Sequence, residues 1–181
     1  GITMEGHILI IDDEASLRQT MARILQRAGY EVTTAADGKE GLALVSEHPF
    51  DLVYSDIRMP DMSGLELLKI IHAKFPDLPV VLFTAQPDLN SAVEAVRSGA
   101  TDYLLKPLKP QTVIDRTNAI LEKNQKERRK REIQRQIEAL QNELSSLEKG
   151  GGEEEADSSP RQVPAPNDRF GQCGKLTLDL Y

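Results

Sequence analysis

Four short apolar stretches of the sequence each lead into polar side chains that are suited to chemistry. The acidic pair Asp12 and Asp13 follows the first stretch, and Asp56 stands at the end of another. Thr84 and Lys106 follow two later stretches in the same way. An isolated aspartate at such a place is most often a loop or helix-capping residue. Four stretches that all end in reactive side chains instead indicate one shared site.

Three carboxylates at one site would repel one another, and this repulsion indicates the chemistry. At an effective dielectric constant near 20, each pair of like charges about 5 Å apart costs roughly 3 kcal/mol. Such a cluster requires a cation, and ligands that are all oxygen favour a hard ion such as Mg²⁺. The Asp56 carboxylate is then a candidate nucleophile toward a phosphoryl group. Lys106 would neutralise the phosphoryl oxygens, and Thr84 would donate a hydrogen bond to one of them.

The apolar stretches alternate with helical patterns about five times along the chain. The strands are expected at residues 7–11, 31–36, 50–54, 79–83 and 102–105, and helices are expected between and after them. This alternation predicts an α/β fold, a doubly wound, five-stranded parallel sheet with helices on both faces. Ligands of such sheets bind outside the carboxyl ends of the strands, which is the edge where all four groups fall.

Three helix starts are marked by residue types. Ser63 with Glu66, and Ser91 with Glu94, have the spacing of a capping box, in which the serine side chain accepts a backbone hydrogen bond. Pro110 suits the first turn of a helix. We therefore expect helices to open at Ser63, at Ser91 and at Pro110.

The helix that begins at Pro110 meets no Gly or Pro before Gly150. Its second half carries apolar residues spaced four, three, four and three, which are Ile133, Ile137, Leu140, Leu144 and Leu147. This heptad seam predicts a homodimer through the helix 110–149, formed as a parallel two-stranded coiled coil. The alternatives are an antiparallel pairing and a folding of the helix back onto its own domain. The charged run 126–131 lacks an apolar seam, and we interpret it as a solvated helix face rather than a nucleic-acid contact.

Composition argues against several classes of protein. The 181 residues carry a net charge of −7 with a pI near 5.1, which disfavours a nucleic-acid surface on this chain as a whole. No apolar run approaches the length of a membrane span, and the first residues lack the pattern of a signal peptide. One cysteine excludes an internal disulfide and fits a cytoplasmic protein.

Shifts in composition predict five segments along the chain. Residues 1–6 are expected to be a tag or a disordered start, 7–122 the α/β domain, and 123–149 a helical coiled-coil extension. Residues 150–169 are acidic and rich in Ser and Pro, which is typical of a disordered linker. Residues 170–181 end in a strand-like alternation and are expected to be the truncated start of an output domain.

From about residue 7 to 122, the sequence resembles the response-regulator receiver domains of two-component signalling. The matching positions are Asp12, Asp13, the run from Asp56 to Gly64, Thr84 with Ala85, Gly99 with Ala100, Tyr103, and Lys106 with Pro107. The resemblance implies a flavodoxin-like fold with strand order 2-1-3-4-5. It also implies a cis peptide between Lys106 and Pro107, an isomer that proline makes accessible.

The resemblance implies a function as well. Asp56 would accept a phosphoryl group from a sensor histidine kinase. The side chains of Asp13 and Asp56 and the backbone carbonyl of Arg58 would hold Mg²⁺, with Asp12 reaching it through water. Thr84 and Tyr103 are predicted to form the switch pair, unless Tyr103 is simply a half-buried strand aromatic. Such a chain is a signalling module rather than an enzyme, because it catalyses only its own phosphorylation and dephosphorylation.

Other interpretations stay open for the output and for the chemistry. The last residues resemble the opening strand of winged-helix transcription regulators, so DNA binding is expected only through a missing C-terminal domain. A dimerising scaffold without phosphotransfer is one alternative, although a scaffold has no need of the acidic cluster. An aspartyl-phosphate phosphatase of the haloacid-dehalogenase type is another, but that family has Asp-x-Asp where Asp12 and Asp13 are adjacent. Treatment with acetyl phosphate, with and without Mg²⁺, separates all three.

Overall fold

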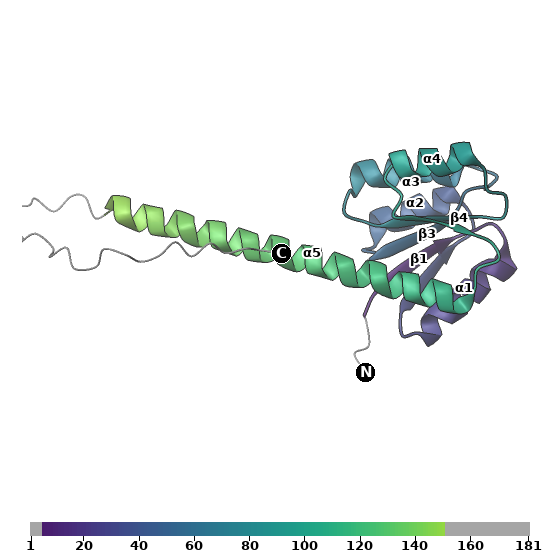
Figure 1. Cartoon of the computed structure of the whole chain (residues 1–181), viewed down its shortest axis with the longest axis horizontal. Helices are drawn as coiled ribbons and strands as arrows, with labels where there is room; N and C mark the ends of the chain where they lie inside the picture. Colours follow the sequence, from purple (N-terminus) through teal and green to yellow (C-terminus); the bar gives the residue numbers. More distant parts are fainter. Residues whose placement is uncertain (1–4, 151–181) are drawn as a thin grey trace, which may run out of the picture. The chain divides into compact units, whose positions relative to one another are not determined.

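The computed structural model describes residues 5–150, which form a parallel sheet covered by helices on both faces (Figure 1). The strands are β1 (His7–Ile11), β2 (Glu31–Ala35), β3 (Leu52–Asp56), β4 (Val80–Thr84) and β5 (Asp102–Leu105). The helices are α1 (Ala15–Arg27), α2 (Gly38–Glu47), α3 (Gly64–Lys74), α4 (Leu89–Arg97) and α5 (Pro110–Gly150). The strands lie in the order β2-β1-β3-β4-β5. The predicted fold, strand order and long last helix are therefore confirmed.

Two apolar layers, one on each face of the sheet, hold these elements together. α1 and the first turns of α5 cover one face, and α2, α3 and α4 cover the other (Figure 1). β3 and β4 are buried along their whole length, which explains why their sequences are nearly unbroken apolar runs. β2 lies at an edge and is more exposed, as its polar residues lead one to expect. The strand ends that carry the polar residues therefore emerge from a packed core.

The helix starts agree with the sequence in two cases and differ in the third. The Ser63 hydroxyl accepts a hydrogen bond from the Glu66 N–H at 3.2 Å, and α5 begins at Pro110. The prediction that Ser91 opens α4 is wrong, because Asp88 is the N-cap and accepts the Ser91 N–H at 2.8 Å. An aspartate three residues earlier supplies the same kind of acceptor, so α4 starts sooner than the capping box suggests.

The charged run 126–131 on α5, which the sequence predicts to be a solvated face, also forms ion pairs with the α/β domain. Arg128 lies 3.6 Å from a carboxylate oxygen of Asp51, and Arg131 lies 3.4 Å from one of Asp77. These acids stand just before β3 and in the turn between α3 and β4, at the amino-terminal edge of the sheet. The pairs are exposed and each contributes no more than about 1 kcal/mol, so they orient this part of α5 more than they stabilise it.

The contacts of the chain divide it into two units, Gly1–Gln134 and Arg135–Tyr181. The seam residues Leu140, Leu144 and Leu147, in the second unit, have exposed fractions of 65%, 58% and 69%. The predicted linker and output strand lie outside the described residues, apart from Gly150. The first four residues of the predicted tag lie outside them as well.

A buried hydrogen bond joins the central strand to α5. The Thr117 hydroxyl donates to the Val113 carbonyl at 2.7 Å, so its one hydrogen is used there. The Tyr54 hydroxyl, 2.6 Å from the Thr117 oxygen, must therefore be the donor in that contact. Burial raises the pKa of Tyr54 to about 12, which keeps the donor proton in place. The contact fixes the position of α5 against β3, the strand that carries both Tyr54 and Asp56.

Removing the Thr117 hydroxyl is expected to destabilise the fold more than removing the Tyr54 hydroxyl. Thr117→Val leaves the buried Tyr54 donor without a partner, and should lower the free energy of unfolding by about 1–3 kcal/mol. Tyr54→Phe leaves Thr117 bonded to Val113, and should cost about 1 kcal/mol or less. Urea unfolding followed by circular dichroism measures both. Equal losses, or a larger loss for Tyr54→Phe, would contradict the assigned donor.

Candidate functional site

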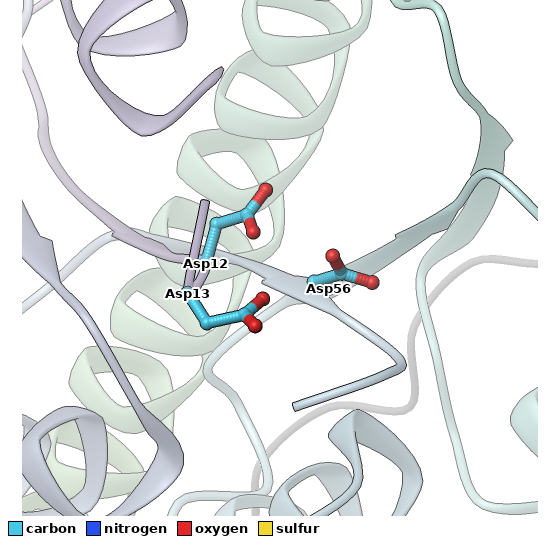
Figure 2. Close-up of side chains that lie close together, drawn as sticks. All are labelled: Asp12, Asp13 and Asp56. Atoms are coloured by element: carbon cyan, nitrogen blue, oxygen red, sulfur yellow. The ribbon is translucent and has the colours of Figure 1, made fainter. Parts of the chain in front are cut away.

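The three aspartates meet at the carboxyl ends of β1 and β3. Because Ile11 lies opposite Ser55 in the parallel pairing of these strands, Asp12 and Asp56 leave the sheet next to each other. Figure 2 shows Asp13 beside them. One carboxylate oxygen from each residue lies within 4.8 Å of the others. Asp12 is fully buried, Asp56 is 6% exposed and Asp13 is exposed, so the cluster opens to solvent on the side of Asp13.

Lys106 completes this cluster from the end of β5. Its ammonium nitrogen lies 2.7 Å from Asp56 Oδ2 and 3.3 Å from Asp12 Oδ2. Burial lowers the pKa of Lys106, but hydrogen bonds and charge attraction from Asp56 and Asp12 outweigh it and raise the pKa overall. The lysine therefore stays charged. The Lys106–Pro107 peptide is cis, as the resemblance implies.

Asp12 is the carboxylate of the cluster whose charged form is destabilised by burial. Burial raises its pKa to about 6, although a hydrogen bond from the Glu14 N–H at 2.9 Å and the charge of Lys106 act in the other direction. The carboxylate is thus ionised at neutral pH at a cost to the folded state. A divalent cation would remove this cost, and three carboxylates with no nitrogen or sulfur donor fit Mg²⁺.

The cost of burying the Asp12 charge predicts a pH-dependent stability. A carboxyl whose pKa is higher in the folded state binds its proton more tightly there. The resulting stabilisation is present at low pH and is lost as the pH rises from 3.8 to about 6. Without divalent cations, Asp12→Asn should therefore raise the free energy of unfolding at pH 7 by about 1–3 kcal/mol.

Urea unfolding in EDTA at pH 4 and pH 7 measures this effect in the wild type and in Asp12→Asn. The gain from the substitution should be large at pH 7 and small at pH 4, because the wild-type Asp12 carboxyl is protonated at the lower pH. A gain of the same size at both pH values would show that the Asp12 charge is not its source.

Thr84 and Tyr103, the predicted switch pair, use their hydroxyls on different partners. Thr84 ends β4, is almost fully buried, and accepts the Gln86 N–H at 3.1 Å. Tyr103 lies half-buried on β5, with its hydroxyl 3.1 Å from that of Ser91 on α4. Sequence reasoning missed this role of Ser91. Once Asp88 is the cap, Ser91 lies inside α4. Its hydroxyl donates to Asp88 Oδ2 at 2.9 Å and is also within hydrogen-bonding distance of the Tyr103 hydroxyl.

The loop after Asp56 is closely fitted to the strand. The Arg58 N–H donates to Asp56 Oδ1 at 3.1 Å, which orients the carboxylate, while the Arg58 side chain is exposed. At the end of the loop, a Cβ on Gly64 would lie 2.3 Å from the Asp56 carbonyl oxygen, so only glycine fits there. The structure thus gathers Asp12, Asp13, Asp56 and Lys106, with the Arg58 backbone at their side.

The fold and this site together define a class of protein. An aspartate at the end of the central strand, between two acids and a lysine on a 2-1-3-4-5 sheet, is the arrangement of a receiver domain. Residues 8–118 match the response regulator receiver domain family, and the chain belongs to that family. Within residues 5–150, no helix has the length and apolar character needed to cross a bilayer.

Three comparisons illustrate the relationship. The chain is 44% identical over 120 residues to the DNA-binding transcriptional regulator NtrC of Proteus hauseri, covering 66% of this chain and 24% of the relative. It is 35% identical over 125 residues to the DNA-binding response regulator MtrA of Mycobacterium bovis, covering 69% and 54%. A CheY-like receiver domain protein from Methanospirillum hungatei superimposes with a TM-score of 0.67 at 34% identity, covering 68% of this chain and 99% of that one.

The shared region is only a part of each of these relatives. The chain spans about a quarter of the NtrC relative and about half of the MtrA relative. The relatedness therefore concerns the receiver domain, and the remainder of those proteins has no counterpart among the aligned residues.

Proposed function

We propose that this chain is a phosphorylation-activated response regulator in which Asp56 accepts a phosphoryl group from a sensor histidine kinase. The observation that carries the proposal is the environment of one carboxylate. Asp56 Oδ1 is held by the Arg58 N–H and Oδ2 by the Lys106 ammonium, 2.7 Å away, beside two further acids. This arrangement orients a nucleophile and supplies positive charge where phosphoryl oxygens would gather.

Each residue of the site has a defined part in the transfer. An Asp56 oxygen attacks phosphorus, the bond from phosphorus to the donor breaks, and the donor leaves with its electron pair. Lys106 exchanges its contact with the carboxylate for one with the phosphoryl oxygens. Asp13, Asp56 and the Arg58 carbonyl would hold Mg²⁺, with Asp12 reaching it through water. The bound ion would supply positive charge for the phosphoryl oxygens.

Acetyl phosphate tests this proposal because it replaces the kinase with a small donor. The wild type should acquire one hydroxylamine-sensitive phosphoryl group per chain when Mg²⁺ is present, and almost none in EDTA. A second assay offers the chain unrelated phosphate esters. Continuous release of inorganic phosphate from them would instead favour the alternative of an aspartyl-phosphate phosphatase. No phosphorylation under either condition would favour the scaffold.

The last helix is the proposed route of output. The seam on residues 133–147 is exposed in a single chain, and a second copy of the helix would cover it. We therefore assign residues 110–149 to a homodimer, with 123–149 as its coiled-coil part, 150–169 as a linker and 170–181 as the start of an output domain. Relatives described as DNA-binding regulators support a transcriptional output, reached through a domain beyond these residues.

The switch pair gives a separate prediction. Phosphorylation should draw the Thr84 hydroxyl away from the Gln86 N–H and release the Tyr103 ring from Ser91 into the vacated space. Thr84→Ala should still be phosphorylated, while the chemical shifts of the Tyr103 ring should change much less than in the wild type. NMR spectra before and after addition of acetyl phosphate measure this. Shift changes of wild-type size in Thr84→Ala would disprove the coupling of these two residues.

A further inference from the structure

The loop that follows Asp56 is fastened to the start of α2. Asp61, in the middle of this loop, accepts the Gly38 N–H on Oδ1 at 3.1 Å and the Lys39 N–H on Oδ2 at 2.9 Å. Gly38 and Lys39 are the first two residues of α2, whose backbone N–H groups have no partner within the helix. The side chain of the N-cap residue Asp37 accepts the next free donor, the Glu40 N–H, at 2.8 Å. One carboxylate from a distant loop therefore completes the capping of α2.

Apolar packing supports the same contact. A Cβ on Gly38 would lie 2.3 Å from Met62 Cγ, so the start of α2 and the loop already touch. At the far end of the loop, the Gly64 N–H donates to the Ile57 carbonyl at 2.8 Å. The loop between Asp56 and Gly64 is thus held at both ends by β3 and α3, and in the middle by α2.

This third attachment concerns the proposed metal site. Arg58 lies in the loop, and its part in that site is a backbone carbonyl. A side-chain ligand can change its rotamer, whereas the position of a backbone carbonyl is set by the conformation of the loop. Its position therefore depends on whatever fixes the loop. Two hydrogen bonds from Asp61 attach the middle of the loop to the start of α2.

We infer that Asp61 is a positioning residue for the Mg²⁺ site, acting through the loop rather than on the ion. The inference rests on the proposed function only for the identity of the Arg58 ligand. Its sequence signal is weak, because an acid in a loop is ordinary and its partners, Gly38 and Lys39, lie more than 20 residues away.

Asp37 offers a matched control for the test. Both aspartates cap the same end of α2, but Asp37 belongs to the turn between β2 and α2 and does not hold the Asp56 loop. Asp61→Ala should weaken Mg²⁺ binding about tenfold, as expected for residues that orient metal ligands. Asp37→Ala should leave the affinity almost unchanged while lowering the melting temperature to a similar degree. Asp61→Asn, which keeps one acceptor oxygen, should fall in between.

Calorimetric titration of the full chain with Mg²⁺ measures these affinities. Hydrogen exchange supplies an independent readout, because coupling between two contacts is reciprocal. Mg²⁺ should slow exchange of the Gly38 and Lys39 amides in the wild type, and should not do so in Asp61→Ala. Phosphorylation of Asp61→Ala by acetyl phosphate should return to nearly the wild-type rate when the Mg²⁺ concentration is raised about tenfold.

Two outcomes would overturn the inference. One is an Asp61→Ala variant that binds Mg²⁺ as tightly as the wild type. The other is an Asp37→Ala variant that loses as much affinity, since the effect would then come from destabilising α2. A failure of the proposed function looks different. A wild type that is never phosphorylated, yet binds Mg²⁺ more tightly than Asp61→Ala, would reject phosphotransfer and support the positioning role.

Discussion

Replacing Asp56 with Asn is expected to abolish phosphorylation by acetyl phosphate, lowering its rate by at least about three orders of magnitude. The amide has nearly the shape of the carboxylate but lacks the nucleophilic oxygen, so the loss reports chemistry rather than folding. Phosphoryl incorporation in the presence of Mg²⁺, measured by mass spectrometry of the intact chain, gives the result.

Asp37→Asn is the control for this substitution. It also removes one carboxylate charge, but Asp37 caps α2 and does not contact the site, so incorporation should be normal. If Asp56→Asn acquired a hydroxylamine-sensitive phosphoryl group at the wild-type rate, Asp56 would not be the acceptor.

Introducing two lysines into the seam of α5 should have the second large effect. Leu140 and Leu144 occupy adjacent core positions of the predicted coiled coil, and the double variant Leu140→Lys, Leu144→Lys would place charges in its apolar interface. The wild type should dimerise weakly at tens of micromolar, because two heptads are near the lower limit for stability. Dimerisation should strengthen on phosphorylation if the receivers also pair. The double variant should sediment as a monomer in both states.

The outer face of the same helix provides the control. Asn142→Lys with Ser145→Lys adds the same charge away from the seam, and should leave the sedimentation unchanged. A wild type that sediments as a monomer with and without phosphorylation would remove the coiled coil from the account of the output.

The sequence predicts the sheet and the cluster because both follow from local patterns. β3 and β4 can be recognised in the sequence as apolar runs, because both strands are buried on both faces of the sheet. The parallel sheet then brings the ends of β1 and β3 together, so Asp12 and Asp56 must be neighbours wherever their side chains point. Lys106 is predicted on the same argument from the end of β5.

The features that sequence reasoning missed depend on partners far apart in the chain. The capping box at Ser91 is a local exception, because Asp88, only three residues earlier, caps the helix instead. The Glu94 of that box pairs with a distant residue, Lys69 of α3, at 2.5 Å. The sequence predicts a solvated Arg128, because its partner Asp51 lies beside it only in the folded chain. The same holds for the Tyr54 and Thr117 hydroxyls, which are 63 residues apart. No local pattern encodes such pairs, because each exists only after the sheet has formed.

Locating the phosphoryl group on the wild-type chain tests the central claim most directly. After treatment with acetyl phosphate and Mg²⁺, borohydride reduces an aspartyl phosphate to homoserine, and peptide mass spectrometry then identifies the altered residue. The account predicts homoserine at position 56 alone, and none when EDTA replaces Mg²⁺. Modification at Asp12, at Asp13 or at a residue outside the cluster, with Asp56 intact, would contradict it.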